Sequence, residues 1–342
     1  MYARPVADAT DEGWMRAAIA AAADVRATAR PNPWVGCTIV ADGELVATGA
    51  TRPPGQAHAE VAALEAAGDR ARGATAYVTL EPCSHTGRTA PCADALVEAG
   101  VARVVVAVLD PDPRVRGAGA ERLRQAGITV DVGCAADLVE RQLAPYLHQR
   151  RTGRPYVVLK LAATLDGRTA APDRTSQWIT GPVARADAHR LRAESDSIVV
   201  GAGTVRDDDP TLTARDADGP DPERIVLGHV PDGARVRPCT EWDGPIEALL
   251  DDLGARGHVQ VLFEGGATVA GDLHRSGLVD RYVVYLAPAL LGGDDAPGLF
   301  RGAGAATIAD AWRGRIESVT SLGDDLRIDL LPHPRSTTEG TP

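Results

Sequence analysis

The chain has 342 residues, 44% of them apolar and 24% charged, which is typical of a soluble globular protein of about two domains. Its net charge of −11, with basic residues scattered along the chain, argues against binding to the phosphates of nucleic acids. No apolar run reaches the roughly 18 residues of a membrane span, and the N-terminal residues lack the apolar core of a secretion signal. We therefore expect a cytoplasmic protein with neither nucleic acid nor membrane as a partner.

Helices and strands alternate in the structure predicted for the first half of the chain. The expected elements are a helix at 12–29, two strands at 35–49 around an Asp42-Gly43 turn, a helix at 58–68, a strand at 74–80, a helix at 90–100, a strand at 103–110, a helix at 117–127 and a strand at 128–133. This order predicts a sheet with helices on both faces.

A polar stretch with glycine and proline, RRTGRP at 150–155, indicates the boundary between two domains, which we expect to cover residues 1–147 and 148–332. In the second domain the pattern predicts strands near 156–161, 197–201, 224–227, 259–264 and 281–287. It predicts helices near 182–193, 245–253 and 267–276. Residues 333–342 are polar and are expected to be disordered.

The first candidate site combines His58 and Glu60 with two cysteines that each follow a proline, Cys83 and Cys92. One imidazole and two thiolates are three zinc ligands, and they leave the fourth position for a water whose pKa the metal lowers toward about 7. Helix N-termini would help keep the thiols deprotonated. Glu60 is placed to move protons beside the metal, as the glutamate does in zinc nucleobase deaminases.

The alternative for this cluster is a closed structural zinc site, for which His85 would be the fourth ligand. The remaining cysteines have no partners at ligand spacing and are expected to be small buried residues. They are Cys37, Cys134 and Cys239.

Three stretches, PNPWVGCTIV, HAEVAALEAAG and TLEPCSHTGRTAPCADAL, resemble the deaminase domain of the bifunctional deaminase–reductases of riboflavin biosynthesis. The resemblance covers the first 147 residues and implies a cytidine-deaminase-like, three-layer α/β/α domain. In this family water replaces the amine at ring carbon 2 of a diaminopyrimidinone that carries a phosphoribosylamino group.

The resemblance also implies a substrate-binding role for Asn32, which would otherwise be read as an ordinary turn residue between prolines. The eight residues between the two cysteines include His85 and Arg88. These two side chains would donate hydrogen bonds to the ribose phosphate of the substrate, which an arginine can bind in a fork.

In the second half no Gly-x-Gly-x-x-Gly follows a strand, so a Rossmann dinucleotide site is not supported. The Gly265-Gly266 turn, between a strand and a helix, would either bring backbone N–H groups to a diphosphate or serve only as a tight turn. The stretches SQWITG, VVGAGTVRDDDPTLTAR and LFEGGATVAGDL resemble the reductase half of the same family. The resemblance implies a dihydrofolate-reductase-like α/β fold that uses NADPH to deliver hydride to C1′ of the ribose.

This resemblance implies two sets of site residues. Cofactor contacts fall on Ala162, Trp178, Thr204, Asp208, Gly265 and Gly266, and substrate contacts on Ser176, Arg192, Leu212, Arg215 and Glu264. Lys160 and Asp208 are expected to protonate or polarise the opening sugar. The alternative for the RDDDP stretch is a solvated acidic loop.

One segment departs from the family pattern, because the chain between Arg215 and Glu264 is short and RIVLGHV lacks the usual Asp after the strand. A strand and its loop are expected to be missing there, which leaves the preference for NADPH over NADH open. Overall we expect a bifunctional enzyme with one Zn²⁺ per chain and NADPH. It would act on a small phosphoribosylaminopyrimidine and assemble as a homodimer or homotetramer.

Three alternatives stay open at this point. The first is a zinc nucleobase or nucleoside deaminase with a degenerate reductase-like binding domain. The second is a nucleic-acid deaminase, which the acidic charge and the long loop between the cysteines oppose. The third is a binding protein with a structural zinc.

Overall fold

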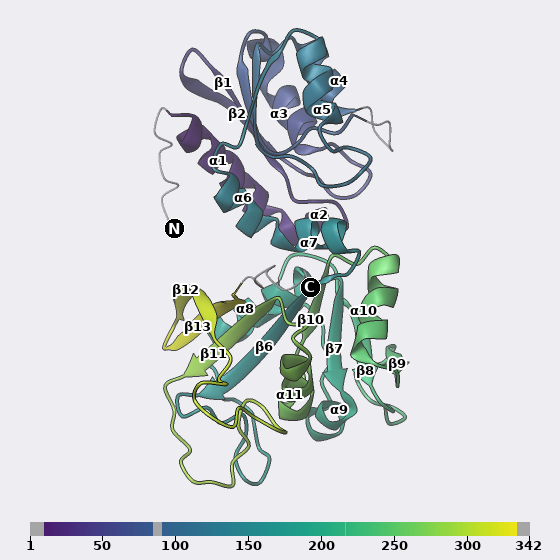
Figure 1. The fold of residues 1–342 in the computed structure, drawn as a ribbon, viewed down its shortest axis with the longest axis vertical. Coiled ribbons are helices and arrows are strands. Elements are labelled where there is room, and N and C mark those ends of the chain that lie inside the picture. Colours follow the sequence, from purple (N-terminus) through teal and green to yellow (C-terminus); the bar gives the residue numbers. More distant parts are fainter. Residues whose placement is uncertain (1–9, 85–90, 216, 334–342) are drawn as a thin grey trace, which may run out of the picture. The chain divides into compact units, whose positions relative to one another are not determined.

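The computed structural model describes residues 10–84, 91–215 and 217–333. The chain forms two compact units, Met1–Arg154 and Pro155–Pro342 (Figure 1). Both are α/β units, as the alternation of predicted helices and strands indicated. Residues 334–342 of the tail predicted to be disordered lie outside the described residues.

The first unit is built on a five-stranded sheet in the order β2-β1-β3-β4-β5. Its elements are α1 (Asp11–Asp24), α2 (Arg26–Ala29), β1 (Gly36–Ala41), β2 (Glu44–Ala50), α3 (Ala59–Ala67), a single-turn helix (Gly68–Ala71), β3 (Thr75–Leu80), α4 (Cys92–Ala99), β4 (Arg103–Val108), α5 (Ala118–Gln125), β5 (Thr129–Val132), α6 (Ala136–Gln142) and α7 (Ala144–Thr152). β1 is antiparallel to β2 and β3, whereas β3, β4 and β5 are parallel. All the elements predicted for residues 12–133 are present; α6 and α7 had not been predicted.

Two glycines show how helices cover both faces of this sheet. Gly36 of β1 pairs with Ala50, and the neighbouring Cys37 pairs with Gly49, so the two glycines face opposite sides. A Cβ atom on Gly36 would lie 1.9 Å from the Ala18 carbonyl oxygen of α1, and one on Gly49 would lie 2.4 Å from backbone atoms of α3. α1 and α3 therefore lie against opposite faces, each in direct backbone contact with the sheet.

The second unit contains an eight-stranded sheet in the order β12-β13-β11-β6-β10-β7-β8-β9. Its elements are β6 (Tyr156–Thr164), α8 (Pro182–Ala193), β7 (Ser197–Gly201), α9 (Ala202–Asp208), β8 (Glu223–Leu227), β9 (Thr240–Trp242), α10 (Ile246–Ala255), β10 (Gln260–Phe263), α11 (Ala267–Ser276), β11 (Arg281–Ala287), β12 (Gly314–Leu322) and β13 (Asp325–Pro332). The strands from β11 to β9 are parallel, and β13 and β12 extend the sheet antiparallel at the β11 edge. The predicted strands and helices are all present, together with α9, β9, β12 and β13.

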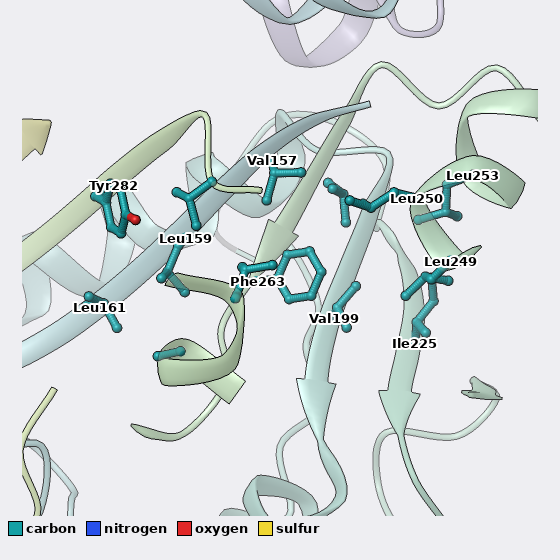
Figure 2. Close-up of a cluster of buried hydrophobic side chains, with 14 residues drawn as sticks. Val157, Leu159, Leu161, Val199, Ile225, Leu249, Leu250, Leu253, Phe263 and Tyr282 are labelled. Carbon is teal, nitrogen blue, oxygen red and sulfur yellow. The ribbon is translucent and has the colours of Figure 1, made fainter. Parts of the chain in front are cut away.

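One face of this sheet carries the apolar core of the unit. Leu159, Val199 and Phe263 of three neighbouring strands belong to this core, together with Leu249 and Leu253 of α10 (Figure 2). Because alternate residues of a strand face opposite sides, the neighbours of these core residues point to the other face. Lys160 of β6 is therefore directed away from this core.

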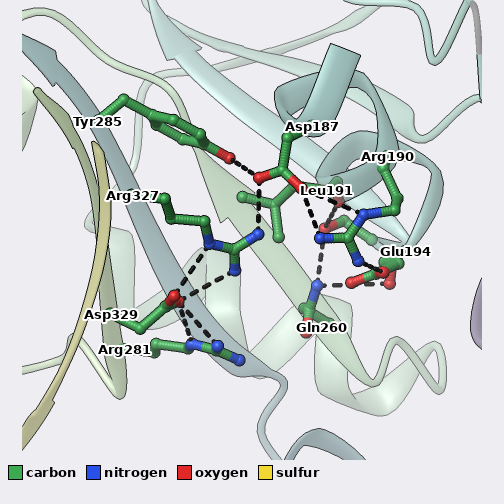
Figure 3. A network of polar contacts seen from close by, with 10 residues as sticks. Asp187, Arg190, Leu191, Glu194, Gln260, Arg281, Tyr285, Arg327 and Asp329 are labelled. Atoms are coloured by element: carbon green, nitrogen blue, oxygen red, sulfur yellow. Dashed lines mark hydrogen bonds and ion pairs between the residues drawn. The ribbon is translucent and has the colours of Figure 1, made fainter. Parts of the chain in front are cut away.

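The other face carries a buried network of charged side chains (Figure 3). Asp187 of α8 accepts hydrogen bonds from the Tyr285 hydroxyl and from Nη1 of Arg327, both at 2.7 Å. Arg327 also pairs with Asp329, which in turn pairs with Arg281. Buried charges are tolerated only when paired in this way, and removing one partner typically costs about 3–5 kcal/mol.

Across the parts of the chain that the structure describes, no helix combines the length and the apolar character needed to cross a membrane.

Candidate active sites

Three elements of the first unit bring the zinc-ligand candidates together. His58 is the residue before α3, Cys83 follows β3, and Cys92 is the first residue of α4. Nδ1 of His58 lies 3.8 Å from Sγ of Cys83 and 3.3 Å from Sγ of Cys92. All three ligand atoms lie within 4.8 Å of one another.

These distances fit a tetrahedral zinc ion. Nitrogen and sulfur ligands bound at about 2.0–2.3 Å from such a centre lie roughly 3.3–3.8 Å apart. Among the described residues no fourth His, Cys, Asp or Glu joins the cluster. His85, the fourth ligand of the closed-site alternative, lies outside those residues, as does Arg88.

Each of the two cysteines shifts the pKa of the other. A hydrogen bond from the Cys92 side chain lowers the pKa of the Cys83 thiol; burial opposes this effect, and His58 adds to it. The pKa of the Cys92 thiol is raised, because it bonds to the Cys83 sulfur and is buried. The cluster alone therefore holds one thiolate readily, and a cation such as zinc would be needed to hold both.

Glu60 lies in the first turn of α3 with a side chain that is almost wholly buried, at 3% relative exposure. Burial, and then the negative charge of Cys83, raise the pKa of Glu60 to about 7. Hydrogen bonding between Glu60 and Cys92 acts in the opposite direction. Glu60 is thus a carboxyl group next to the ligand cluster whose proton is exchangeable near neutral pH.

Asn32 lies in the loop between α2 and β1, where its backbone N–H donates to the Ala29 carbonyl at 3.0 Å. Its role in substrate binding stays a prediction.

Sequence reasoning missed Glu81, a buried carboxylate two residues before Cys83 that bonds to four backbone N–H groups. The one signal in the sequence was its place between an apolar strand and a proline-flanked ligand.

In the second unit the structure brings together Lys160, Arg192 and Glu264, which come from β6, α8 and the residue after β10. Arg192 binds Glu264 through two parallel hydrogen bonds of 2.7 and 2.9 Å, and Nζ of Lys160 lies 3.6 Å from the same carboxylate. Burial alone would raise the pKa of Glu264, but the charges of Arg192 and Lys160 lower it to about 2. Glu264 is therefore a fixed negative charge near neutral pH.

Lys160 is largely buried, with 19% of its side chain exposed. Its ammonium group lies 5.8 Å from the ring centroid of Tyr285, within the range of a cation–π contact. Tyr285 pairs with Ala162, two residues along β6, so Lys160, Ala162 and Tyr285 share one face of the sheet. This is the face that carries the charged network of Figure 3.

Other predicted residues of this unit form separate contacts. Oγ of Ser176 donates to Asp208 at 3.2 Å, and Trp178 is exposed with the guanidinium of Arg185 over its ring. Leu212 is buried with a positive φ of 53°, and Arg215 donates to the Thr211 hydroxyl. Asp208 contacts Ser176, whereas Lys160 contacts Glu264, so the joint action of Asp208 and Lys160 stays a prediction.

The predicted cofactor glycines lie where β10 leads into α11. A Cβ atom on Gly265 would lie 2.6 Å from Cβ of Val269, and one on Gly266, the residue before α11, would lie 3.6 Å from the Thr204 hydroxyl. Gly201 is the residue before α9, at the end of the neighbouring strand β7, and a Cβ atom on it would lie 3.0 Å from Val269. Open α/β sheets bind ligands at this carboxyl end of their parallel strands.

Comparisons with known proteins match both units. A family model for the RibD C-terminal domain matches residues 155–328, and one for the cytidine and deoxycytidylate deaminase zinc-binding region matches residues 8–108. The riboflavin biosynthesis protein RibD of Escherichia coli K12 is 41% identical over 364 aligned residues, covering 94% of this chain and 99% of the relative. RibD of Mycobacterium tuberculosis H37Rv is 44% identical, covering 90% and 93%.

Solved structures agree with these matches. The structure of Acinetobacter baumannii RibD, form 1, is 40% identical and superimposes with a TM-score of 0.88, covering 95% of this chain and 99% of that chain. The likeness therefore spans both units and both candidate sites. The chain belongs to the RibD family of riboflavin biosynthesis proteins.

Proposed function

We propose that the chain catalyses two successive steps of riboflavin biosynthesis. The first is hydrolytic deamination of a diaminopyrimidinone bearing a phosphoribosylamino group, and the second is reduction of the ribosyl group to ribityl by NADPH. The observation that carries the proposal is that each unit brings a group of its predicted site residues together. They are His58, Cys83, Cys92 and Glu60 in the first, and Lys160, Arg192 and Glu264 in the second.

In the deaminase step, His58, Cys83 and Cys92 would hold one zinc ion. When bound, the zinc would supply a water that is acidic enough to attack near neutral pH. Glu60 would take a proton from the attacking water on a carboxylate oxygen and pass it to the substrate, finally to the departing amine. Its burial beside the ligands keeps that proton away from bulk water.

In the reductase step, opening of the ribose ring moves a proton to the ring oxygen, and hydride addition at C1′ requires a further proton on the attached nitrogen. NADPH would supply the hydride. Lys160 is suited to hold and release the proton at its Nζ, since an arginine in its place would stay protonated at any accessible pH. Glu264, fixed as an anion, holds Lys160 in place.

The remaining predicted contacts complete this proposal. Arg192 and Glu264, both expected to bind substrate, contact each other in the structure, so a substrate phosphate or hydroxyl would bind at a preformed ion pair. Asp208 and Ser176 would contact the sugar as a second, separate pair. The presence of Lys160, Arg192 and Glu264 as one cluster speaks against a degenerate reductase unit.

Mass spectrometry of the products tests the proposal. Without NADPH, the diaminopyrimidinone phosphate should be converted to a product in which oxygen replaces one amine. With NADPH, that product should gain two hydrogens. A chain that deaminates but leaves the ribosyl group unreduced with either NADPH or NADH would instead be a single-activity deaminase.

A further inference from the structure

The carboxylate of Glu81 has an unusual set of partners for a residue so close to a metal ligand. Glu81 follows β3, is 4% exposed and accepts four hydrogen bonds, all from backbone N–H groups. Oε2 accepts from Asp110 at 3.2 Å and Gly117 at 2.9 Å, and Oε1 accepts from Gly119 at 3.0 Å and Ala120 at 3.1 Å. These bonds match the roughly four acceptor sites of a carboxylate, so Glu81 has little capacity left for a metal or a substrate.

The four donors come from two elements that are remote from Glu81 in the sequence. Asp110 follows β4, the parallel neighbour of β3, and the Glu81 N–H donates to the Val108 carbonyl at 3.0 Å. The other three donors form the start of α5, where Gly117 is the residue before the helix. Glu81 therefore joins the ends of two strands to the start of one helix.

The start of α5 also packs directly against the residue that precedes Cys83. A Cβ atom on Gly119 would lie 1.9 Å from the carbonyl oxygen of Pro82, closer than any real contact. On its other side Cys83 is held by α4. The N–H of Ala93 donates to the Cys83 carbonyl at 3.1 Å, and the N–H of Cys92 to its sulfur at 3.3 Å.

We propose that Glu81 is a positioning residue for the zinc site. Its carboxylate fixes the exit of β3 against α5 and so holds the sulfur of Cys83 at ligand distance from His58 and Cys92. A ligand that is already in place loses less conformational freedom on binding, which strengthens metal affinity. The proposal rests on the zinc site assigned above, and it concerns how that site is held.

The first test uses the full-length chain with Glu81→Gln. The amide has the size of the carboxylate, but its NH₂ group would face two backbone N–H donors. Because the NH₂ group is itself a donor, it cannot accept their hydrogen bonds. Competition with a chromogenic chelator should show a zinc dissociation constant raised about 10- to 100-fold, the usual effect of losing an outer-shell contact. Asp112→Asn is the matched control. Asp112 is a buried carboxylate on the loop between β4 and α5, and it accepts a hydrogen bond from the backbone N–H of Arg114 and none from the Glu81 site. That variant should bind zinc as the parent does.

A second variant reaches the same segment without changing any charge. Gly119→Ala should push Pro82 and with it Cys83. The absorption bands of the cobalt-substituted chain, which report thiolate ligation, should therefore shift in this variant and in Glu81→Gln alike. Far-ultraviolet circular dichroism and the thermal unfolding profile of the same preparations, compared with the parent, show whether the first unit is folded. If Glu81→Gln does not fold, Gly119→Ala alone decides.

The outcomes separate the two ideas. A parent chain that binds no zinc would contradict the proposed deaminase site itself. A parent that binds zinc, with folded Glu81→Gln and Gly119→Ala chains that keep parental affinity and cobalt spectrum, would overturn the role of Glu81 and leave the site intact.

Discussion

Lys160 is the single lysine of a chain in which lysine and arginine together number 36. Arginine thus serves at every other basic position, including Arg192 beside the same carboxylate. The two residue types differ in one property that matters here, because an ammonium group can release its proton at accessible pH and a guanidinium cannot. At the residue scale, the reductase chemistry that we propose for the second unit depends on this one side chain.

We predict that Lys160→Arg keeps the positive charge near Glu264 but loses most of the reductase rate, on the order of 100-fold or more for a missing proton donor. Deamination should be unaffected, and so should binding of NADPH measured by its fluorescence. Retention of the full reductase rate would show that Lys160 acts through its charge alone.

The lone lysine also allows a chemical test on the unaltered protein. An amine-acylating reagent can modify only Lys160 and the N-terminal amine, and peptide mass spectrometry distinguishes the two. Modification of Lys160 should abolish reduction in proportion to its extent and leave deamination unchanged. Saturating deaminated substrate should protect the lysine; equal modification with and without substrate would place it away from the bound sugar.

For the first unit we predict that Glu60→Gln retains zinc but loses deamination by on the order of 100-fold or more, because the amide can neither accept nor deliver a proton. Zinc content is measured by atomic absorption on the same preparation. Loss of the metal from this variant would mean that Glu60 holds the site together, and an unchanged rate would exclude it as the proton carrier.

At the scale of elements, the sequence predicts best where one face of a segment is buried. The expected ranges 197–201 and 182–193 coincide with β7 (Ser197–Gly201) and α8 (Pro182–Ala193), both of which carry apolar residues into the core. β12 was missed because most of its residues are exposed, so it has no apolar alternation to read. β9 has three residues, too few for any period.

The same contrast holds for the candidate sites. The spacing of His58, Cys83 and Cys92 identified a ligand cluster that the structure assembles from three elements. Arg192 and Glu264, which form an ion pair, are 72 residues apart in the sequence, and the residues around each of them do not indicate the other as its partner. Contacts of this kind follow from the packing of the sheet, which a single sequence does not display.

The turn from β10 into α11 gives a prediction at this scale. Gly265→Ala would force a Cβ atom to within 2.6 Å of Val269, so the start of α11 must shift. Overpacking costs about 1–3 kcal/mol. If this free-energy cost weakens the complex with the cofactor, the KM for NADPH rises roughly 5- to 150-fold. Gly304→Ala is the control, since a Cβ atom there meets nothing within 4 Å. An unchanged KM for the Gly265 variant would place the cofactor elsewhere.

At the scale of the whole molecule, the two units carry chemically unrelated sites in separate folds. The ligand cluster and Glu60 belong to the first unit, and Lys160, Arg192 and Glu264 to the second. Removing zinc with a chelator should therefore abolish deamination and leave reduction of the deaminated intermediate at its original rate. Restoring one zinc per chain should restore the first activity; parallel loss of both activities would mean that the metal also supports the second unit.

One isotope experiment tests the central claim, that a single chain performs both steps, most directly. The diaminopyrimidinone phosphate is incubated with the enzyme in heavy-oxygen water and NADPH that carries deuterium at its transferable position. The account predicts one final product that contains a heavy oxygen at ring carbon 2 and a deuterium at C1′ of the ribityl chain. A product with heavy oxygen but no deuterium, or no conversion at all, would contradict it.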